Sequence, residues 1–290
     1  MKVSVGFICT ATFLAVAPAL AAETAETEGS ETMEAKAEFP EVHWDEMRSL
    51  MEKEGPAAVV AFVAAFDDAE QRRKLFSFAR FGFAMNEWEG KNLDAVVAVA
   101  NAGIAEGLRQ AEAATSAEEA AKLVDYANVM SYNLSADLAE CWPGDTLPRD
   151  KRHLEAGLKA AEDCIRWREE LGKGPEPFAI AYWAKGMHQL SLDDVAGAVE
   201  SFRTSLDYNV GAAKEAGEAT EVSPEAGFGL ILAEGYVALA LWAAGDEDGK
   251  TRYDNAIAAF REGAEKYPDK KDDFQFGVDQ LEWVKGKFIK

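Results

Sequence analysis

The chain has 290 residues, of which 52 are acidic and 30 basic, so its formal net charge at pH 7 is −22. This negative field repels the phosphate backbone, so the composition argues against nucleic acid as a partner. Only 9 residues are proline, and Val and Ile rarely alternate with polar residues, so strands have almost no support. An all-α protein is expected, and its acidity favours solubility over a dedicated cation or basic-peptide site.

The first 21 residues have the pattern of a secretory signal peptide. Lys2 precedes an apolar run from Val3 to Ala17, and the small residues Ala19 and Ala21 precede the first acidic residue, Glu23. The run is too short and too soon followed by acidic residues to predict a membrane span. We therefore expect a periplasmic or secreted protein without stable membrane insertion.

The mature chain is expected to contain two parts. Residues 22–40 are rich in Glu, Thr and Ala, with little to bury, and predict an acidic disordered tether. Residues 41–290 predict one helical domain. From the apolar spacing and the turn residues, helices are expected over 43–54, 57–66, 75–88, 92–113, 116–141, 150–171, 178 to about 217 as a pair, about 228–245, 253–267 and 272–290.

The clearest pattern lies in Tyr236–Asp269, which predicts two helices folded back on each other. Its second helix carries Ala256, Phe260 and Gly263 at helical spacing and stops at Pro268. Ala, an aromatic four residues on, a small residue three further and a final Pro is the A-x3-F…P half of the tetratricopeptide pattern. To keep this register, residues 247–252 are expected to be an inserted surface loop.

A second copy of the pattern lies in residues 178–206. Gly186, Ala198, Phe202 and Ser205 follow one another at steps of twelve, four and three residues. The chain therefore resembles tetratricopeptide repeat (TPR) proteins, most clearly over residues 178–268. The resemblance implies helical hairpins that form a right-handed α-solenoid of about ten or eleven helices, closed by a C-terminal capping helix.

The resemblance also implies a binding groove, because the first helix of each TPR pair lines the concave surface. By register, the groove positions of this chain are Ile180, Trp183, Met187, Leu190, Leu232, Leu239 and Trp242. These side chains are mostly apolar. Such a groove suits a partner's amphipathic helix or an apolar or aromatic small molecule, and a helix of the chain itself is the third candidate occupant.

The residues that could carry chemistry are scattered. His43, His153 and His188 are far apart in the sequence, and no HExxH, GxSxG or GxxxxGK[ST] motif occurs. Cys141 and Cys164 lack CxxC spacing. A disulfide between them needs the intervening loop to fold back along a helix by roughly 20 Å. We expect no enzyme activity, no cofactor and no metal site.

Two functions remain as expectations. The first is an exported TPR-like scaffold that binds a partner protein or peptide and has no chemistry of its own. The alternative is a periplasmic module for an apolar or aromatic small molecule, similar to the helical-repeat proteins associated with TRAP (tripartite periplasmic) transporters.

Overall fold

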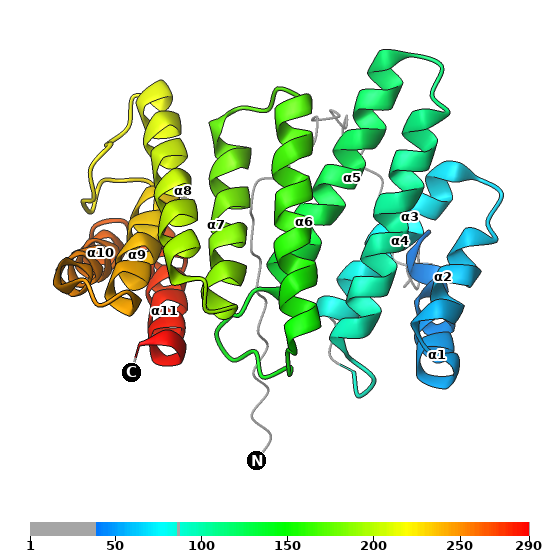
Figure 1. The fold of residues 1–290 in the computed structure, drawn as a ribbon, viewed down its shortest axis with the longest axis horizontal. Helices are drawn as coiled ribbons and strands as arrows, with labels where there is room; N and C mark the ends of the chain where they lie inside the picture. Colours follow the sequence, from blue (N-terminus) through cyan, green and yellow to red (C-terminus); the bar gives the residue numbers. More distant parts are fainter. Residues whose placement is uncertain (1–38, 86–87, 290) are drawn as a thin grey trace, which may run out of the picture. The chain divides into compact units, whose positions relative to one another are not determined.

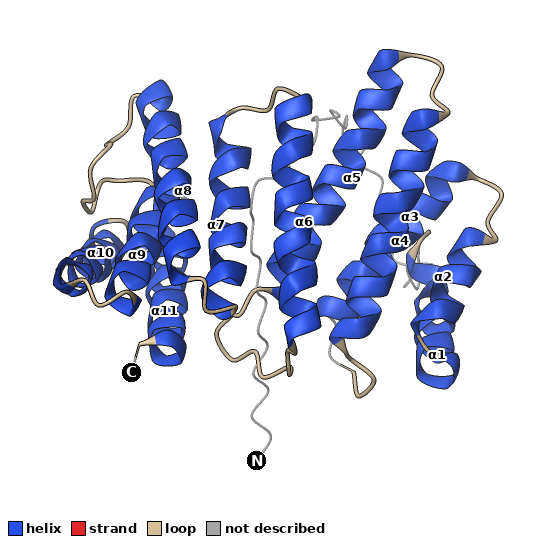
Figure 2. Cartoon of the chain, in the orientation of Figure 1, coloured by secondary structure: helices blue, strands red, loops and turns tan. Residues whose placement is uncertain are grey.

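The computed structural model describes residues 39–85 and 88–289 (Figure 1). In these ranges every regular element is a helix, which confirms the all-α expectation (Figure 2). The expected signal peptide, residues 1–21, lies outside the described residues, and so does the expected tether except for its last two residues, Phe39 and Pro40.

The described residues form eleven α-helices and two short 3₁₀-helices. In chain order these are η1 (Glu41–His43), α1 (Trp44–Glu54), α2 (Pro56–Ala64), α3 (Ala69–Met85), α4 (Leu93–Glu112), α5 (Ala117–Leu138), α6 (Lys151–Glu170), α7 (Pro175–Ser191), α8 (Val195–Ala216), α9 (Phe228–Ala243), α10 (Glu247–Lys266), η2 (Pro268–Lys270) and α11 (Lys271–Phe288). None of these helices is both long and apolar enough to cross a membrane.

Short polar side chains set where several helices begin. Asn92 accepts a hydrogen bond from the Ala95 backbone at 2.8 Å and starts α4. Ser116 accepts one from the Glu119 backbone at 3.1 Å, which confirms it as the predicted N-cap of α5. The Glu119 carboxylate accepts from the Thr115 backbone at 3.1 Å. Two neighbouring side chains therefore provide hydrogen-bond acceptors for backbone N–H groups at the start of α5.

The end of α8 confirms the long second helix expected before the last pair. The helix continues to Ala216, and Gly217 follows it with φ +70° in the left-handed region. The Glu218 backbone N–H then donates to the Ala213 carbonyl at 2.8 Å. A glycine in this conformation ends a helix without the strain that a side chain would add.

The expected surface loop at residues 247–252 is wrong, because these residues form the first turns of α10. Asp246 caps the helix by accepting from the Asp248 backbone at 3.0 Å. Gly249 is buried where a Cβ would meet the backbone of Trp242, so this turn packs tightly on α9. The Asp246 cap and the close packing of Gly249 on α9 therefore set the start of α10, six residues before the start that the repeat register predicted.

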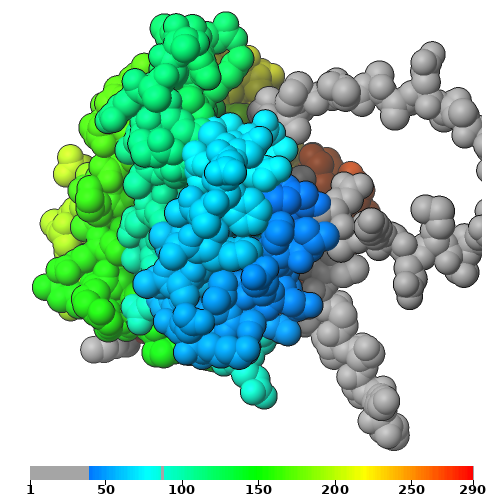
Figure 3. Space-filling view, turned by 90° about the vertical axis from the view of Figure 1, so that its right-hand side faces the viewer, coloured from blue at the N-terminus to red at the C-terminus, as the bar shows by residue number. Residues whose placement is uncertain are grey.

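Each helix packs against the next along the chain. We call α3, α5, α7 and α9 the first helices, and α4, α6, α8 and α10 the second helices, of four consecutive pairs. One large hydrophobic cluster joins α1–α6, and a second joins α6–α11 with the residues that follow α5. Figure 3 shows the N-terminal helices in blue and cyan, packed directly on the green helices that follow.

Candidate functional site

The expected groove residues on α7 are mostly buried. Trp183 exposes 8% of its surface and Leu190 3%, Met187 is fully buried, and Ile180 is partly exposed. The Trp183 ring lies 6.0 Å from the Tyr236 ring of α9, with the two rings edge to face. The enclosed indole therefore contributes to the stability of the fold in this structure.

The expected groove residues on α9 have different surroundings. Leu239 is fully buried, Leu232 exposes 8% of its surface, and Trp242 is partly exposed. Trp242 lies beside Tyr253 of α10, with ring centroids 5.9 Å apart. Trp183 and Trp242 therefore have different neighbours, and the structure does not join the seven residues into one open groove.

Helix α11 covers part of this surface. Its Leu281 lies against Gly235, so close that a Cβ at residue 235 would be 2.8 Å from Leu281 Cδ2. At the same helix, Lys285 lies over the Tyr253 ring at 5.0 Å from its centroid. Since α11 packs on both α9 and α10, it occupies the face of α9 that the repeat register assigns to the groove.

The segment Ala139–Trp142, which directly follows α5, covers the adjoining part of the expected groove, on α7. Trp142 lies between two aromatic rings, 6.1 Å from Trp183 and 6.4 Å from Phe276 of α11. Lys287 of α11 pairs with Glu140 of this segment at 2.5 Å. Two elements of the chain thus fill the expected groove from within, which was the third of the candidate occupants.

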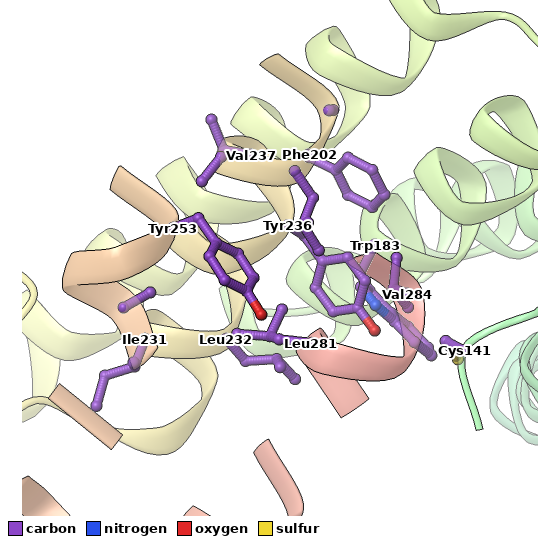
Figure 4. Packing of buried hydrophobic residues seen from close by; sticks show 14 of the residues in the cluster. Cys141, Trp183, Phe202, Ile231, Leu232, Tyr236, Val237, Tyr253, Leu281 and Val284 are labelled. Carbon is purple, nitrogen blue, oxygen red and sulfur yellow. The ribbon is translucent and has the colours of Figure 1, made fainter. Parts of the chain in front are cut away.

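Buried polar groups gather beneath α11. Trp183 Nε1, Tyr236 OH, Tyr253 OH and Gln280 Oε1 are enclosed. The side chains of Trp183 and Cys141 lie next to the Tyr236 hydroxyl, and the Gln280 side chain lies next to the Cys141 thiol. Figure 4 shows Trp183, Tyr236 and Cys141 close together beside Leu281 and Val284 of α11. These side chains form a polar cluster inside an otherwise apolar contact between α7, α9 and α11.

The two cysteines lie in separate surroundings and are not bonded to each other. Burial raises the pKa of the Cys141 thiol to about 12, and the nearby Gln280 side chain opposes that rise. Burial also raises the pKa of Cys164 to about 12. Cys164 donates to Asn128 Oδ1 at 3.3 Å, far along the chain from α11. Both thiols are therefore protonated at neutral pH in the folded chain.

The three histidines have three structural roles. His153 caps α6 by accepting from the Asp150 backbone at 3.1 Å. His43 lies among phenylalanine rings, 5.1 Å from Phe66. His188 is fully buried and its Nε2 donates to the Ser135 carbonyl at 2.9 Å. Across the described ranges, no three His, Cys, Asp or Glu side chains are grouped to hold a metal ion.

Three exposed apolar side chains lie on α3 and α5, two neighbouring first helices. Phe81 and Met85 of α3 are 49% and 50% exposed, and Val129 of α5 is 48% exposed. The two helices are in contact, because Ser77 donates to Met130 Sδ at 3.6 Å. We call Phe81, Met85 and Val129 the α3–α5 patch.

Comparison with known proteins identifies no relative. No family model, curated protein or solved structure matches this chain. Function must therefore be argued from the residues and contacts above.

Sequence reasoning missed the patch, and it named a helix of the chain as a candidate occupant of the groove without identifying which one. The repeat pattern is weak over α3 and α5, so register gave no groove positions there. A signal was available in α3, where Phe81 and Met85 stand four residues apart on one helical face beside a buried Phe83. Nothing in the local pattern indicates that Trp142 and α11 meet over Trp183.

Proposed function

We propose that this protein is an exported TPR-like scaffold that binds a partner protein or peptide and has no chemistry of its own. The observation that carries the proposal is the α3–α5 patch. Four large apolar side chains among the described residues are about half exposed, and Phe81, Met85 and Val129 are three of them. Large apolar side chains exposed on neighbouring helices are typical of a docking surface.

The paired helices support the scaffold part of this proposal. In the described ranges the chain is a series of helices, each of which packs on its neighbours in the chain. Export rests on the signal-peptide pattern of residues 1–21.

Native mass spectrometry of the protein, isolated from the compartment of its own host, tests the proposal. Wild type should carry a stoichiometric protein partner, and Phe81→Glu should lose it. Ala105→Glu, at an exposed position of second helix α4, is the matched control and should retain it. A bare chain in all three samples, or equal retention by both variants, would contradict the proposal.

Binding of a small apolar or aromatic molecule is the second candidate function. A shallow hollow lies at the α2–α3 connection and is lined by Phe62, Ala65, Phe66, Asp67, Asp68 and Gln71. Its two phenylalanine rings could stack on such a ligand. The same mass spectra separate the candidates, because a retained molecule of defined small mass would favour this one.

A further inference from the structure

Helix α2 ends in a cluster of aromatic rings that is only partly buried. Val59 and Val63 are fully buried in the core, whereas Phe62 and Phe66, four residues apart, both reach the surface. The two phenyl rings meet edge to face, with centroids 5.4 Å apart. The His43 ring lies 5.9 Å from Phe62 and 5.1 Å from Phe66, also edge to face. Packing against one another holds these rings in fixed orientations.

The hollow at the α2–α3 connection has aromatic walls and an acidic rim. Its lining residues are Phe62, Ala65, Phe66, Asp67, Asp68 and Gln71. Its volume is about 440 Å³, which lies within the roughly 300–1,000 Å³ typical of small-molecule sites. Among the described residues that line it there is no lysine or arginine. The charge at this hollow is therefore negative and stands beside two phenyl rings.

The basic side chains nearest to the rim are paired with other carboxylates. Arg72 pairs with Glu106 at 2.7 Å, and Lys74 pairs with Glu70 at 2.6 Å. A hydrogen bond from a backbone N–H lowers the pKa of the Asp68 carboxyl, which is therefore ionised at neutral pH. Within the described part of the chain, neither rim carboxylate forms an ion pair with a basic side chain.

The connection that forms the rim is fixed by side chains of α3 and α4. Arg72 donates to the Asp67 carbonyl at 3.0 Å and also to the Phe66 carbonyl. Gln110 of α4 donates to the Ala69 carbonyl at 3.0 Å. The hollow is thus formed without a ligand, and a preformed site loses less conformational freedom on binding.

We propose that this hollow binds a small organic cation that carries a quaternary ammonium group. Aromatic faces and carboxylates both attract a cation, and the methyl groups around the nitrogen make apolar contact with Phe62 and Phe66. A neutral apolar molecule gains the contact with the rings and gains nothing from Asp67 and Asp68. The ligand class therefore differs in charge from that of the second candidate function, and the site is independent of the α3–α5 patch.

Choline and its uncharged isostere 3,3-dimethyl-1-butanol are the probes, because they share one shape and differ in charge. Titration of the full chain with each, followed by NMR of the backbone amides, measures the site and the affinity together. Choline should shift the amides of residues 62–71 in a saturable way, with a Kd in the millimolar range. The alcohol should bind at least about threefold more weakly.

Two substitutions separate the contributions of the carboxylate and the ring. Asp67→Asn removes one charge at nearly constant size, and should raise the Kd of choline by roughly two- to fivefold while leaving the Kd of the alcohol unchanged. Phe66→Leu keeps an apolar side chain and removes the aromatic face, and should weaken choline by a similar factor. Asp207→Asn, at an exposed carboxylate of α8, is the matched control and should leave both affinities unchanged.

Equal binding of choline and the alcohol to the wild-type chain would overturn the proposal and favour the neutral ligand of the second candidate function. The proposal is also overturned if choline gives no saturable shift at residues 62–71, or if Asp67→Asn and Asp207→Asn bind choline equally well. Retention of a protein partner by Phe81→Glu is measured separately. Failure of the partner-binding proposal therefore leaves the result at this hollow unchanged.

Discussion

Gly235 of α9 and Leu281 of α11 are in such close contact that a methyl group on residue 235 would overlap the leucine side chain. Leu281 is fully buried, so it cannot rotate away freely. Gly235→Ala should therefore destabilise the protein by about 1–3 kcal/mol through overpacking. Urea denaturation measures the change.

Gly211 of α8 is the matched control for this substitution. A Cβ at residue 211 would meet nothing within 4 Å. Gly211→Ala should stabilise the helix by about 0.5–1 kcal/mol, because alanine loses less backbone freedom on folding. If the two variants unfold at the same urea concentration, α11 does not pack on α9 as described.

Truncating the two tryptophans should have unequal effects. Trp183 is enclosed by Trp142 and Tyr236, so Trp183→Ala should cost about 3–5 kcal/mol of stability. Trp242 is partly exposed, and Trp242→Ala should cost less than about half of that. Thermal melts without any ligand compare them. A small loss for Trp183→Ala would mean that the indole faces an open groove after all.

Phe260 is expected to be one of the main supports of the last pair. It is fully buried, with Phe228 at 5.4 Å and Phe274 at 6.0 Å between ring centroids. Phe260→Ala should cost about 3–5 kcal/mol in equilibrium unfolding. A cost below about 1 kcal/mol would place the side chain at the surface and refute the packing of α10 against α11.

His188 should make stability depend on pH. The pKa of His188 is lowered to about 4, chiefly by burial and to a smaller degree by nearby Arg149, while the bond to the Ser135 carbonyl and the charge of Glu140 oppose the change. The unfolded chain, with a histidine pKa near 6.5, takes up a proton in the window where the folded chain does not. The stability that neutral, buried His188 contributes is therefore fully present above about pH 6.5. As the pH falls toward 4, the free energy of unfolding decreases by about 3 kcal/mol.

The measurement is urea unfolding at several pH values for wild type and His188→Gln. Because carboxylates also titrate at the acidic end of this window, the difference between the two proteins isolates the histidine. Wild type should lose more stability than the variant between pH 6.5 and 4.5. Parallel curves would mean that the ring is hydrated or charged in the folded state.

Much of the helical structure could be predicted because its signals are local. Ser116 caps α5 and α10 ends before Pro268, as their neighbours in the sequence indicate. The error at residues 247–252 came from giving the repeat register more weight than Asp246, a good N-cap residue directly before them. Local capping chemistry was the better guide there.

The candidate sites could be predicted much less well, because they depend on contacts between distant residues. Glu140 and Lys287 are 147 positions apart, and no spacing rule joins them. Register placed Trp183 on a first-helix face, but the cover over it comes from Trp142, which in turn stacks on Phe276 of α11. A periodic pattern shows which face of a helix is apolar and leaves open what covers that face.

The most direct test of partner binding is site-specific photo-crosslinking in cells of the protein's own host. A photoreactive residue replaces Phe81 of first helix α3 in one strain and exposed Arg203 of second helix α8 in another. We predict a protein adduct of one defined mass from position 81 and none from position 203. Equal adducts from both positions, or none from position 81, would contradict a partner-binding surface on α3 and α5.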